Sequence, residues 1–466
     1  MEGEKKTKYF KSIFIIITVV LILLAIYIIY IKNNTEAIEE TKNIRTLNIS
    51  KNIIIGITEF DTLNPITTKS IEVQYLTKLI YKPLIEITKD FNVQESIAKE
   101  WSKTGEKEYI IKLGDVKWHN GSEVTARDVE FTINTIKNSD SIYKRNVESI
   151  ETIEIIDDKT IKFTLSETQD FFEYLLCFPI VKENTYDIAN IGTNSYQVEE
   201  ITEKQIILKN NERKITINIY DTISELYSAF SKEKVDIIIT QNNNYQEYIG
   251  NIGISYQLIT GRNFYYINFN EKLEKNTRYQ IKKLINREQI IYELYNNKYI
   301  IADFPLEYGS YLNSAIEYKN EKNDVLTTQL TLGITNEEEM YKIAEIIKKQ
   351  LEEEGIDVDI IYYYNFENAI NNSYYDLVLN KETVPITPNL DVYFKGKNLQ
   401  DIYQIENREI LKQKYEELIK QYSQELPFMG LFFNSYIILH NSSVKGDFSG
   451  NWYNPFYGVD TYYKVD

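Results

Sequence analysis

The hydrophobic pattern of residues 214–240 predicts a strand, a helix and a second strand. Residues 214–220 alternate polar and apolar side chains, as a half-buried strand does. Asp221 or Thr222 can cap the following helix, whose apolar side chains share one face. Residues 235–240 are a short apolar run, which indicates a buried strand.

A second pattern of the same kind follows about 100 residues later. Residues 330–333 form a strand, and Thr335-Asn336-Glu337-Glu338 matches a capping box, in which side-chain oxygens accept the free N–H groups of a helix start. Gly355 ends the helix, and residues 356–362 form the next strand. A strand, a helix and a strand at this spacing indicate parallel pairing. The two patterns therefore predict two α/β lobes.

The region between residues 105 and 165 has a different pattern. Three strands are predicted, at Glu108–Leu113, residues 150–156 and Thr160–Leu165. Asp157-Asp158-Lys159 is a tight-turn signal between the last two strands. One helix interrupts the strands, because Thr125-Ala126-Arg127-Asp128 forms a second capping box after the Asn120-Gly121 turn. We therefore expect an α/β protein with an extra α+β subdomain.

Residues 13–31 form an apolar run of 19 residues. A helix of that length is about 30 Å long, which matches the hydrocarbon thickness of a bilayer. Lysines precede the run at positions 5, 6, 8 and 11, and positive charge is retained on the cytoplasmic side of a membrane. No small-residue cleavage site follows the run. We expect an uncleaved single-pass anchor in the cell membrane, with a cytoplasmic N-terminus and the bulk of the chain extracellular.

Composition argues against several classes of function. The 466 residues carry a formal net charge of −17, whereas a nucleic-acid partner requires a basic surface. The single cysteine, Cys177, excludes an intramolecular disulfide and lies too far along the chain to carry a lipid anchor. With only two histidines, His119 and His440, a transition-metal site is not expected, and nothing indicates a cofactor.

One pair of motifs could belong to a penicillin-binding-type serine hydrolase. Ser96-Ile97-Ala98-Lys99 matches S-x-x-K, and Lys103-Thr104-Gly105 matches K-T-G. In such enzymes the two motifs come from different elements that meet at a cleft. Here three residues separate them, so they cannot surround a substrate in that manner. We keep the hydrolase as a disfavoured alternative and expect no enzymatic activity.

A longer motif between residues 97 and 131 carries a family resemblance. Ile97-Ala98-Lys99-Glu100-Trp101 and Glu108–Leu113 lead to Val116-Lys117-Trp118-His119-Asn120-Gly121-Ser122-Glu123-Val124-Thr125-Ala126-Arg127-Asp128-Val129-Glu130-Phe131. The motif closely resembles the signature of the oligopeptide/dipeptide/nickel-type solute-binding proteins of ABC importers (extracellular solute-binding protein family 5). Further matches keep the family's order at Asp61-Thr62-Leu63-Asn64-Pro65, Gly192-Thr193-Asn194-Ser195-Tyr196, Val235-Asp236-Ile237, Asn268-Phe269-Asn270 and Tyr375-Asp376-Leu377.

The resemblance implies a two-lobed fold, of the periplasmic-binding-protein-like or Venus flytrap type, whose lobes close around a ligand. Trp118, Gly121, Thr125 and Asp128 belong to the matched signature, which is scaffold in this family. The resemblance therefore implies that these four residues hold the fold and do not contact the ligand.

Candidate ligand contacts also come from the resemblance. In peptide-binding members an acidic side chain of the second lobe, in the stretch after Tyr-Asp-Leu, pairs with the amino terminus of the peptide. Asp391 has the approximate place here, although the family's Trp and Asp-Pro elements are missing from residues 384–394. A buried carboxylate needs a partner charge, which the ammonium group of a ligand could supply. The alternative is an ordinary surface Asp. Asn268, Tyr393 and Trp452 are weaker candidates by position.

The patterns and the resemblance together predict a division of the chain. Its parts are a cytoplasmic flank and transmembrane anchor at residues 1–31, a tether at 32–46, lobe I at 47–255 with the α+β subdomain at about 75–185, lobe II at 256–428, and a return to lobe I at 429–466.

The implied function is a membrane-anchored extracellular solute-binding protein that acts as a monomer. It would capture peptides in the cleft between the lobes and deliver them to an ABC permease and its ATPase. A peptide-sensing receptor of the same fold is the alternative, because family members of Gram-positive cells usually carry a lipidated Cys and this chain has an apolar run instead. Nickel is a less favoured ligand, since the chain has only two histidines.

Overall fold

The computed structural model describes residues 24, 25, 27, 49–185, 191–250, 253–307, 309–318, 328–394 and 397–465. Its contacts divide the chain into two compact units, one of residues Met1–Ser50 with Val465–Asp466 and one of Lys51–Lys464. Of the predicted anchor, residues 13–31, only Leu24, Ala25 and Tyr27 are described, and the predicted tether at residues 32–46 lies outside the described residues. No helix within the described ranges is long and apolar enough to cross a membrane.

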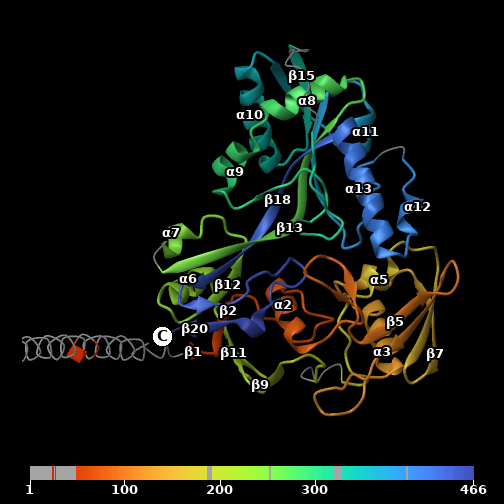
Figure 1. Ribbon diagram of the computed structural model, residues 1–466, viewed down its shortest axis with the longest axis vertical. Helices are drawn as coiled ribbons and strands as arrows, with labels where there is room; N and C mark the ends of the chain where they lie inside the picture. Colours follow the sequence, from red (N-terminus) through yellow and green to blue (C-terminus); the bar gives the residue numbers. More distant parts are fainter. Residues whose placement is uncertain are drawn as a thin grey trace, which may run out of the picture. The chain divides into compact units, whose positions relative to one another are not determined.

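One large mixed sheet runs through the unit Lys51–Lys464 (Figure 1). In order, its strands are β16 (Asp357–Tyr362), β15 (Gln329–Ile334), β17 (Leu377–Thr383), β13 (Ile254–Phe269), β18 (Phe428–Asn441), β12 (Ile237–Thr240), β2 (Ile53–Ile57), β11 (Lys214–Ile219), β10 (Gln205–Lys209) and β9 (Gln197–Ile201), with β14 (Ile300–Ile301) on β18. We call the half that contains β9–β12 and β2 the first lobe, and the half that contains β15–β17 the second lobe. The paired strands β13 and β18 run through both halves.

The first lobe contains the predicted strand, helix and strand. Helix α6 (Ile223–Ser231) begins at Thr222, whose hydroxyl accepts the N–H of Glu225 at 3.2 Å. Strands β11 and β12 are parallel, as predicted, but they do not pair with each other, because β2 lies between them and pairs with both. The other helices of this lobe outside the subdomain are α2 (Ile71–Ile80) and α7 (Gln246–Ile249).

The second lobe contains the other predicted unit. Strands β15 and β16 pair in parallel around helix α10 (Glu338–Glu353), which confirms the pattern. The predicted capping box at Thr335 is wrong, because the helix begins at Glu338 and its N-cap is Glu337. The Glu337 carboxylate instead pairs with Lys381 of β17 at 2.6 Å. Further helices are α8 (Lys275–Leu284), α9 (Arg287–Tyr295), α11 (Phe366–Asn371), α12 (Gln400–Tyr403) and α13 (Arg408–Glu425).

The predicted α+β subdomain is an antiparallel sheet in the order β5 (Ala98–Lys103), β6 (Glu108–Leu113), β8 (Thr160–Leu165) and β7 (Ile150–Asp157). Its helices are α3 (Ala126–Lys137), α4 (Lys144–Val147) and α5 (Phe172–Leu175). Strands β7 and β8 form the predicted hairpin at residues 157–159. Short strands elsewhere in the chain are β1 (Ile49–Ser50), β3 (Glu86–Ile87), β4 (Val93–Gln94), β14, β19 (Val444–Lys445) and β20 (Tyr463–Val465).

The subdomain also bears on the hydrolase alternative. Lys99 lies on strand β5 and Ser96 lies in the bend just before it. A Lys activates the Ser of S-x-x-K from one helical turn away, and this segment has no helix. The domain boundaries drawn from the sequence stay predictions.

Candidate ligand-binding cleft

The two lobes are joined by an irregular stretch of the central strand pair. The pairing of β13 with β18 changes register between Thr260 and Phe264. Gly261 lies in this gap, where a Cβ atom would meet the side-chain oxygen of Asn434 at 2.2 Å. That oxygen accepts the N–H of Asn263 at 2.8 Å. A side chain thus replaces regular ladder bonds where the chain passes between the lobes, and this irregularity is suited to a hinge.

The lobes also touch each other away from the hinge. Asp90 of the first lobe accepts the N–H of Tyr311 on its carbonyl oxygen at 2.9 Å, and its carboxylate pairs with Arg408 of α13 at 3.0 Å. The hydroxyl groups of Tyr174 and Tyr311 are 3.4 Å apart. The structure therefore has the lobes in contact across the cleft.

A small cavity of about 20 Å³ lies between the lobes. The first lobe contributes Phe91, Tyr174 and Trp452 to its wall, and the second lobe contributes residues 305–307, 310 and 384–389. Such a volume holds about one water molecule or one ammonium-sized group. The rings of Phe91 and Trp452 are stacked with their centroids 5.8 Å apart.

Glu307 is the charged residue of this wall, and it is only 5% exposed. One carboxylate oxygen accepts the indole N–H of Trp452. The other oxygen is buried and has no hydrogen-bond partner among the described residues. Burial raises the pKa of Glu307 well above its usual range, and the hydrogen bond from Trp452 and the charge of Arg262 only partly oppose this.

Arg262 connects this cavity to the hinge. It follows Gly261 on β13, and its Nε atom donates to the carbonyl oxygen of Val384 at 3.0 Å. Its guanidinium lies over the Trp452 ring, 4.6 Å from the centroid, in a cation–π contact. Arg262 thereby fixes both the 384–389 wall and the Trp452 ring relative to the hinge.

A larger cavity of about 460 Å³ lies farther out and shares Tyr174 with the small one. Its first-lobe wall includes Trp101, Tyr109 and residues 169–171, 173 and 174, and its second-lobe wall includes Tyr311 and residues 403–406. Burial and the nearby Glu406 raise the pKa of Glu173 in this wall. The volume falls in the range of small-ligand sites.

Comparison with known proteins agrees with this arrangement. The profile of the family described as bacterial extracellular solute-binding proteins, family 5 Middle, matches residues 92–398, which is more than half of the chain. The chain belongs to this family. The resemblance stated from the sequence motifs is confirmed.

Relatives of this family 5 protein are distant in sequence. A Brucella ovis protein named as an ABC transporter peptide-binding protein is 21% identical over 220 residues, which cover 40% of this chain and 41% of that protein. The chain thus spans about two fifths of the length of the curated relatives it matches.

Solved structures share its fold over a greater length. The murein tripeptide binding protein MppA, in its unliganded open form, is 15% identical, with 90% of this chain and 98% of that chain covered and a TM-score of 0.72. A nickel ABC transporter protein from Bacillus halodurans is 17% identical, with 85% and 96% covered and a TM-score of 0.69. The substrate-binding protein CtaP from Listeria monocytogenes is 18% identical, with 90% and 100% covered and a TM-score of 0.60. The predicted two-lobed fold is therefore confirmed, whereas the transmembrane helix stays a prediction.

The candidate ligand contacts of this family 5 protein do not come together at one place. Trp452 lines the small cavity. Asp391 is exposed, and its carboxylate accepts the hydroxyl of Tyr403 at 3.1 Å. Tyr393 is buried among the rings of the second lobe, and Asn268 is half-buried on β13 opposite Val378 and Phe428. Their ligand roles stay predictions.

The signature residues form a separate network. The buried Asp128 carboxylate accepts the N–H groups of Thr125 and Glu183, each at 2.8 Å, and the indole N–H of Trp118 at 3.4 Å. Gly121 has a φ of +84°, which favours glycine, and its N–H donates to the carbonyl oxygen of Trp118. These contacts are intramolecular and hold the start of α3, which suits the scaffold role that the resemblance implies.

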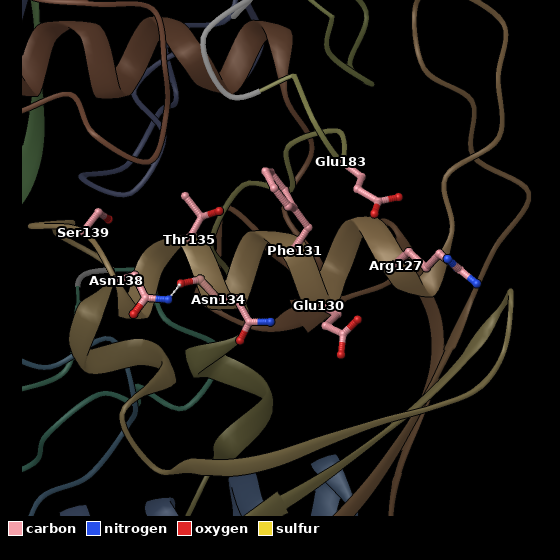
Figure 2. A pocket seen from close by; sticks show the side chains of 8 residues that line it. All are labelled: Arg127, Glu130, Phe131, Asn134, Thr135, Asn138, Ser139 and Glu183. Carbon is pink, nitrogen blue, oxygen red and sulfur yellow. Dashed lines mark hydrogen bonds between the residues drawn. The ribbon is translucent and has the colours of Figure 1, made fainter.

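A third hollow, of about 580 Å³, lies on one face of α3 (Figure 2). Figure 2 shows Arg127, Glu130, Phe131, Asn134 and Thr135 along the helix, Asn138 and Ser139 just past its end, and Glu183 near its start. Every described residue of its wall belongs to the first lobe, so closure of the second lobe cannot enclose a ligand there. We therefore favour the cleft between the lobes as the binding site.

Proposed function

We propose that this protein captures peptides in the cleft between its lobes and delivers them to an ABC importer, as a monomer held on the outer face of the cell membrane. The observation that carries the proposal is that both lobes supply the walls of the two cavities, so a hinge motion opens and closes the site. Family membership and the peptide-binding names of its relatives support a peptide as the ligand.

The cleft also has the chemistry that a peptide needs. Aromatic rings supply apolar contact area, and they include Phe91, Trp101, Tyr174 and Trp452. Glu307 offers an acceptor for a positive group. The outer cavity has charges of both signs, from Lys103 and Arg408 and from Asp170, Glu173 and Glu406. A site of this kind combines apolar walls with a few fixed polar groups.

We expect short peptides to copurify with the protein. Purified residues 34–466, denatured and analysed by mass spectrometry, should release peptides that a mock purification from cells without the protein does not release. Protein that carries no peptide and binds none would contradict peptide capture, and a covalent β-lactam adduct at Ser96 would favour the hydrolase.

Loss of peptide uptake on deletion of the gene separates import from sensing, because a sensor leaves uptake unchanged.

We expect residues 13–31 to keep the protein in the membrane. The full chain should sediment with membranes and resist alkaline carbonate extraction, whereas a chain that begins at residue 34 should be in the soluble fraction. Protease added to intact cells should degrade the bulk of the full chain, because it lies outside. Recovery from the medium of a shortened product whose N-terminus lies near residue 31 would contradict an uncleaved anchor.

A further inference from the structure

A hairpin of the first lobe reaches across the cleft and contacts the second lobe. Its strands β3 and β4 are paired, and residues 88–92 connect them. The carbonyl oxygen of Asp90, at the tip, accepts the N–H of Tyr311 at 2.9 Å. The Asp90 carboxylate pairs with Arg408, the first residue of α13, at 3.0 Å. The tip is therefore bonded to two separate segments of the second lobe.

The next residue of the tip is buried against the second lobe. Phe91 is 9% exposed and belongs to an apolar cluster that the second lobe mainly forms. Its φ is +57°, in the left-handed region that a bulky side chain rarely adopts. Such a conformation persists only where surrounding contacts hold it, and it is typical of clamps and switches. The contacts with the second lobe thus hold the turn in a strained conformation that separation of the lobes would release.

Each contact of the tip is made by groups of the chain itself. The Arg408 guanidinium also lies over the Tyr311 ring, 4.5 Å from its centroid. The rings of Phe171 and Tyr403 meet across the same interface, with their centroids 5.4 Å apart. The ion pair is half-exposed and contributes little alone, so the buried Phe91 ring is the main anchor. Because no ligand atom is needed for these contacts, the protein can make them before a ligand binds.

We propose that the β3–β4 hairpin is a clasp that keeps the cleft shut for most of the time before a ligand binds. The clasp opposes binding, because a ligand can enter the cleft only while the lobes are apart. The apparent affinity is then the affinity of the open form reduced by the fraction of molecules that are open. The clasp itself needs no ligand, whereas its effect on peptide capture rests on the proposed function.

Lys89, next to Asp90 in the same turn, provides a matched control. It pairs with Asp447 at 2.5 Å, and its Nζ atom also donates to Ser449 at 2.5 Å. Both partners belong to the first lobe, where the neighbouring Phe448 packs on the apolar core. Loss of this pair therefore alters the hairpin and leaves the contacts between the lobes in place.

The test measures the distance between the lobes with two spin labels and pulsed electron paramagnetic resonance. The labels are attached at Glu154→Cys on β7 and Glu416→Cys on α13, both at exposed positions, and the buried Cys177 does not take a label. The full chain is unfolded in urea, freed of copurified peptide and refolded in detergent micelles. Before peptide is added, its main distance should be the one that the structure gives for the labelled pair.

Two variants test the clasp. Phe91→Gly combined with Arg408→Gln removes the anchor and the ion pair, and glycine accepts the φ of +57°. This double variant should lower the ratio of the short to the longer distance about tenfold or more, because a buried aromatic anchor carries most of the energy of such a contact. The control Lys89→Ala should keep the natural distribution. Asp90→Ala, whose side chain lines neither cavity, should capture about 2- to 5-fold more of a random-sequence tetrapeptide library at a subsaturating concentration.

The outcomes separate the clasp from the proposed function. A natural chain that has mainly the longer distance before peptide is added would overturn the clasp, and so would a double variant with the natural distribution. Capture by Asp90→Ala that does not exceed natural capture would overturn the opposition to binding. If the double variant fails to fold, judged by thermal melting, Arg408→Gln alone and the natural chain still decide. Failure of every chain to capture the library would contradict peptide capture, and the distances would still decide the clasp.

Discussion

Replacing Asp236 with alanine is expected to destabilise the first lobe by about 3–5 kcal/mol, the range for removal of one partner of a buried ion pair. Asp236 is 1% exposed and precedes β12. One carboxylate oxygen accepts the N–H of Ile54 on β2 at 2.9 Å, and the other pairs with Lys464 at 3.0 Å. Alanine leaves the N–H of Ile54 on β2 and the ammonium group of Lys464 on β20 without their acceptor.

Urea unfolding, followed by circular dichroism, measures this effect. Asp236→Asn keeps an oxygen for Ile54 but loses the charge that faces Lys464, so its loss should be smaller. Lys51→Ala is the matched control, because its partner Glu212 is 69% exposed and such pairs contribute about 0–1 kcal/mol. A change of less than about 1 kcal/mol in Asp236→Ala would show that the pair does not hold these strands.

The contacts of Asp236 also explain the motif Val235-Asp236-Ile237, which the sequence analysis identified only by its resemblance to the family. Val235-Asp236-Ile237 keeps the family's order, and nothing local to it distinguishes its Asp from other acidic residues. Its partners Ile54 and Lys464 are 182 and 228 residues away in the chain. The motif is explained by a contact between distant strands, which periodicity cannot predict.

Local patterns predicted the elements well where local forces decide them. Strand β6 has the predicted bounds Glu108–Leu113, because its alternating side chains match one buried and one outer face. The capping box at Thr125 formed, since its partner Asp128 is also held by Glu183 and Trp118. The capping box at Thr335 did not form: Glu337 is the N-cap, and Glu338, which would have been its second member, pairs instead with Lys342 one turn along the helix. Glu337 also pairs with Lys381 on a neighbouring strand, a contact that the local pattern does not contain.

The cleft could be predicted only in outline. The sequence contains 69 acidic residues, and no pattern separates Glu307 from the others. Its burial depends on Trp452, which is 145 residues away, and on Phe91 from the other lobe. Trp452 was a candidate by its position in the family, but its acidic partner was not. Arg262 was also missed, because its role depends on the irregular pairing that follows Gly261.

Replacing Asp128 with alanine should lower the free energy of unfolding by about 3 kcal/mol or more. This is the second large effect that we expect. Asp128 is 4% exposed, and its carboxylate accepts N–H groups from Thr125, Glu183 and Trp118. Alanine leaves three donors without an acceptor and breaks the capping box of α3, whose N-cap is Thr125. A helix cap contributes about 1 kcal/mol, and each buried unsatisfied donor costs about 1–3 kcal/mol.

Variants at the same helix separate a scaffold role from a ligand role. Asp128→Asn keeps one acceptor oxygen and should lose less stability than alanine, and Arg127→Ala, at an exposed position, should stay within about 0.5 kcal/mol of the natural chain. Asp128 is absent from the described walls of both cavities between the lobes. At a temperature where Asp128→Ala is folded, its peptide affinity should therefore equal that of the natural chain. Loss of peptide binding by the folded variant would contradict a role confined to holding the start of α3.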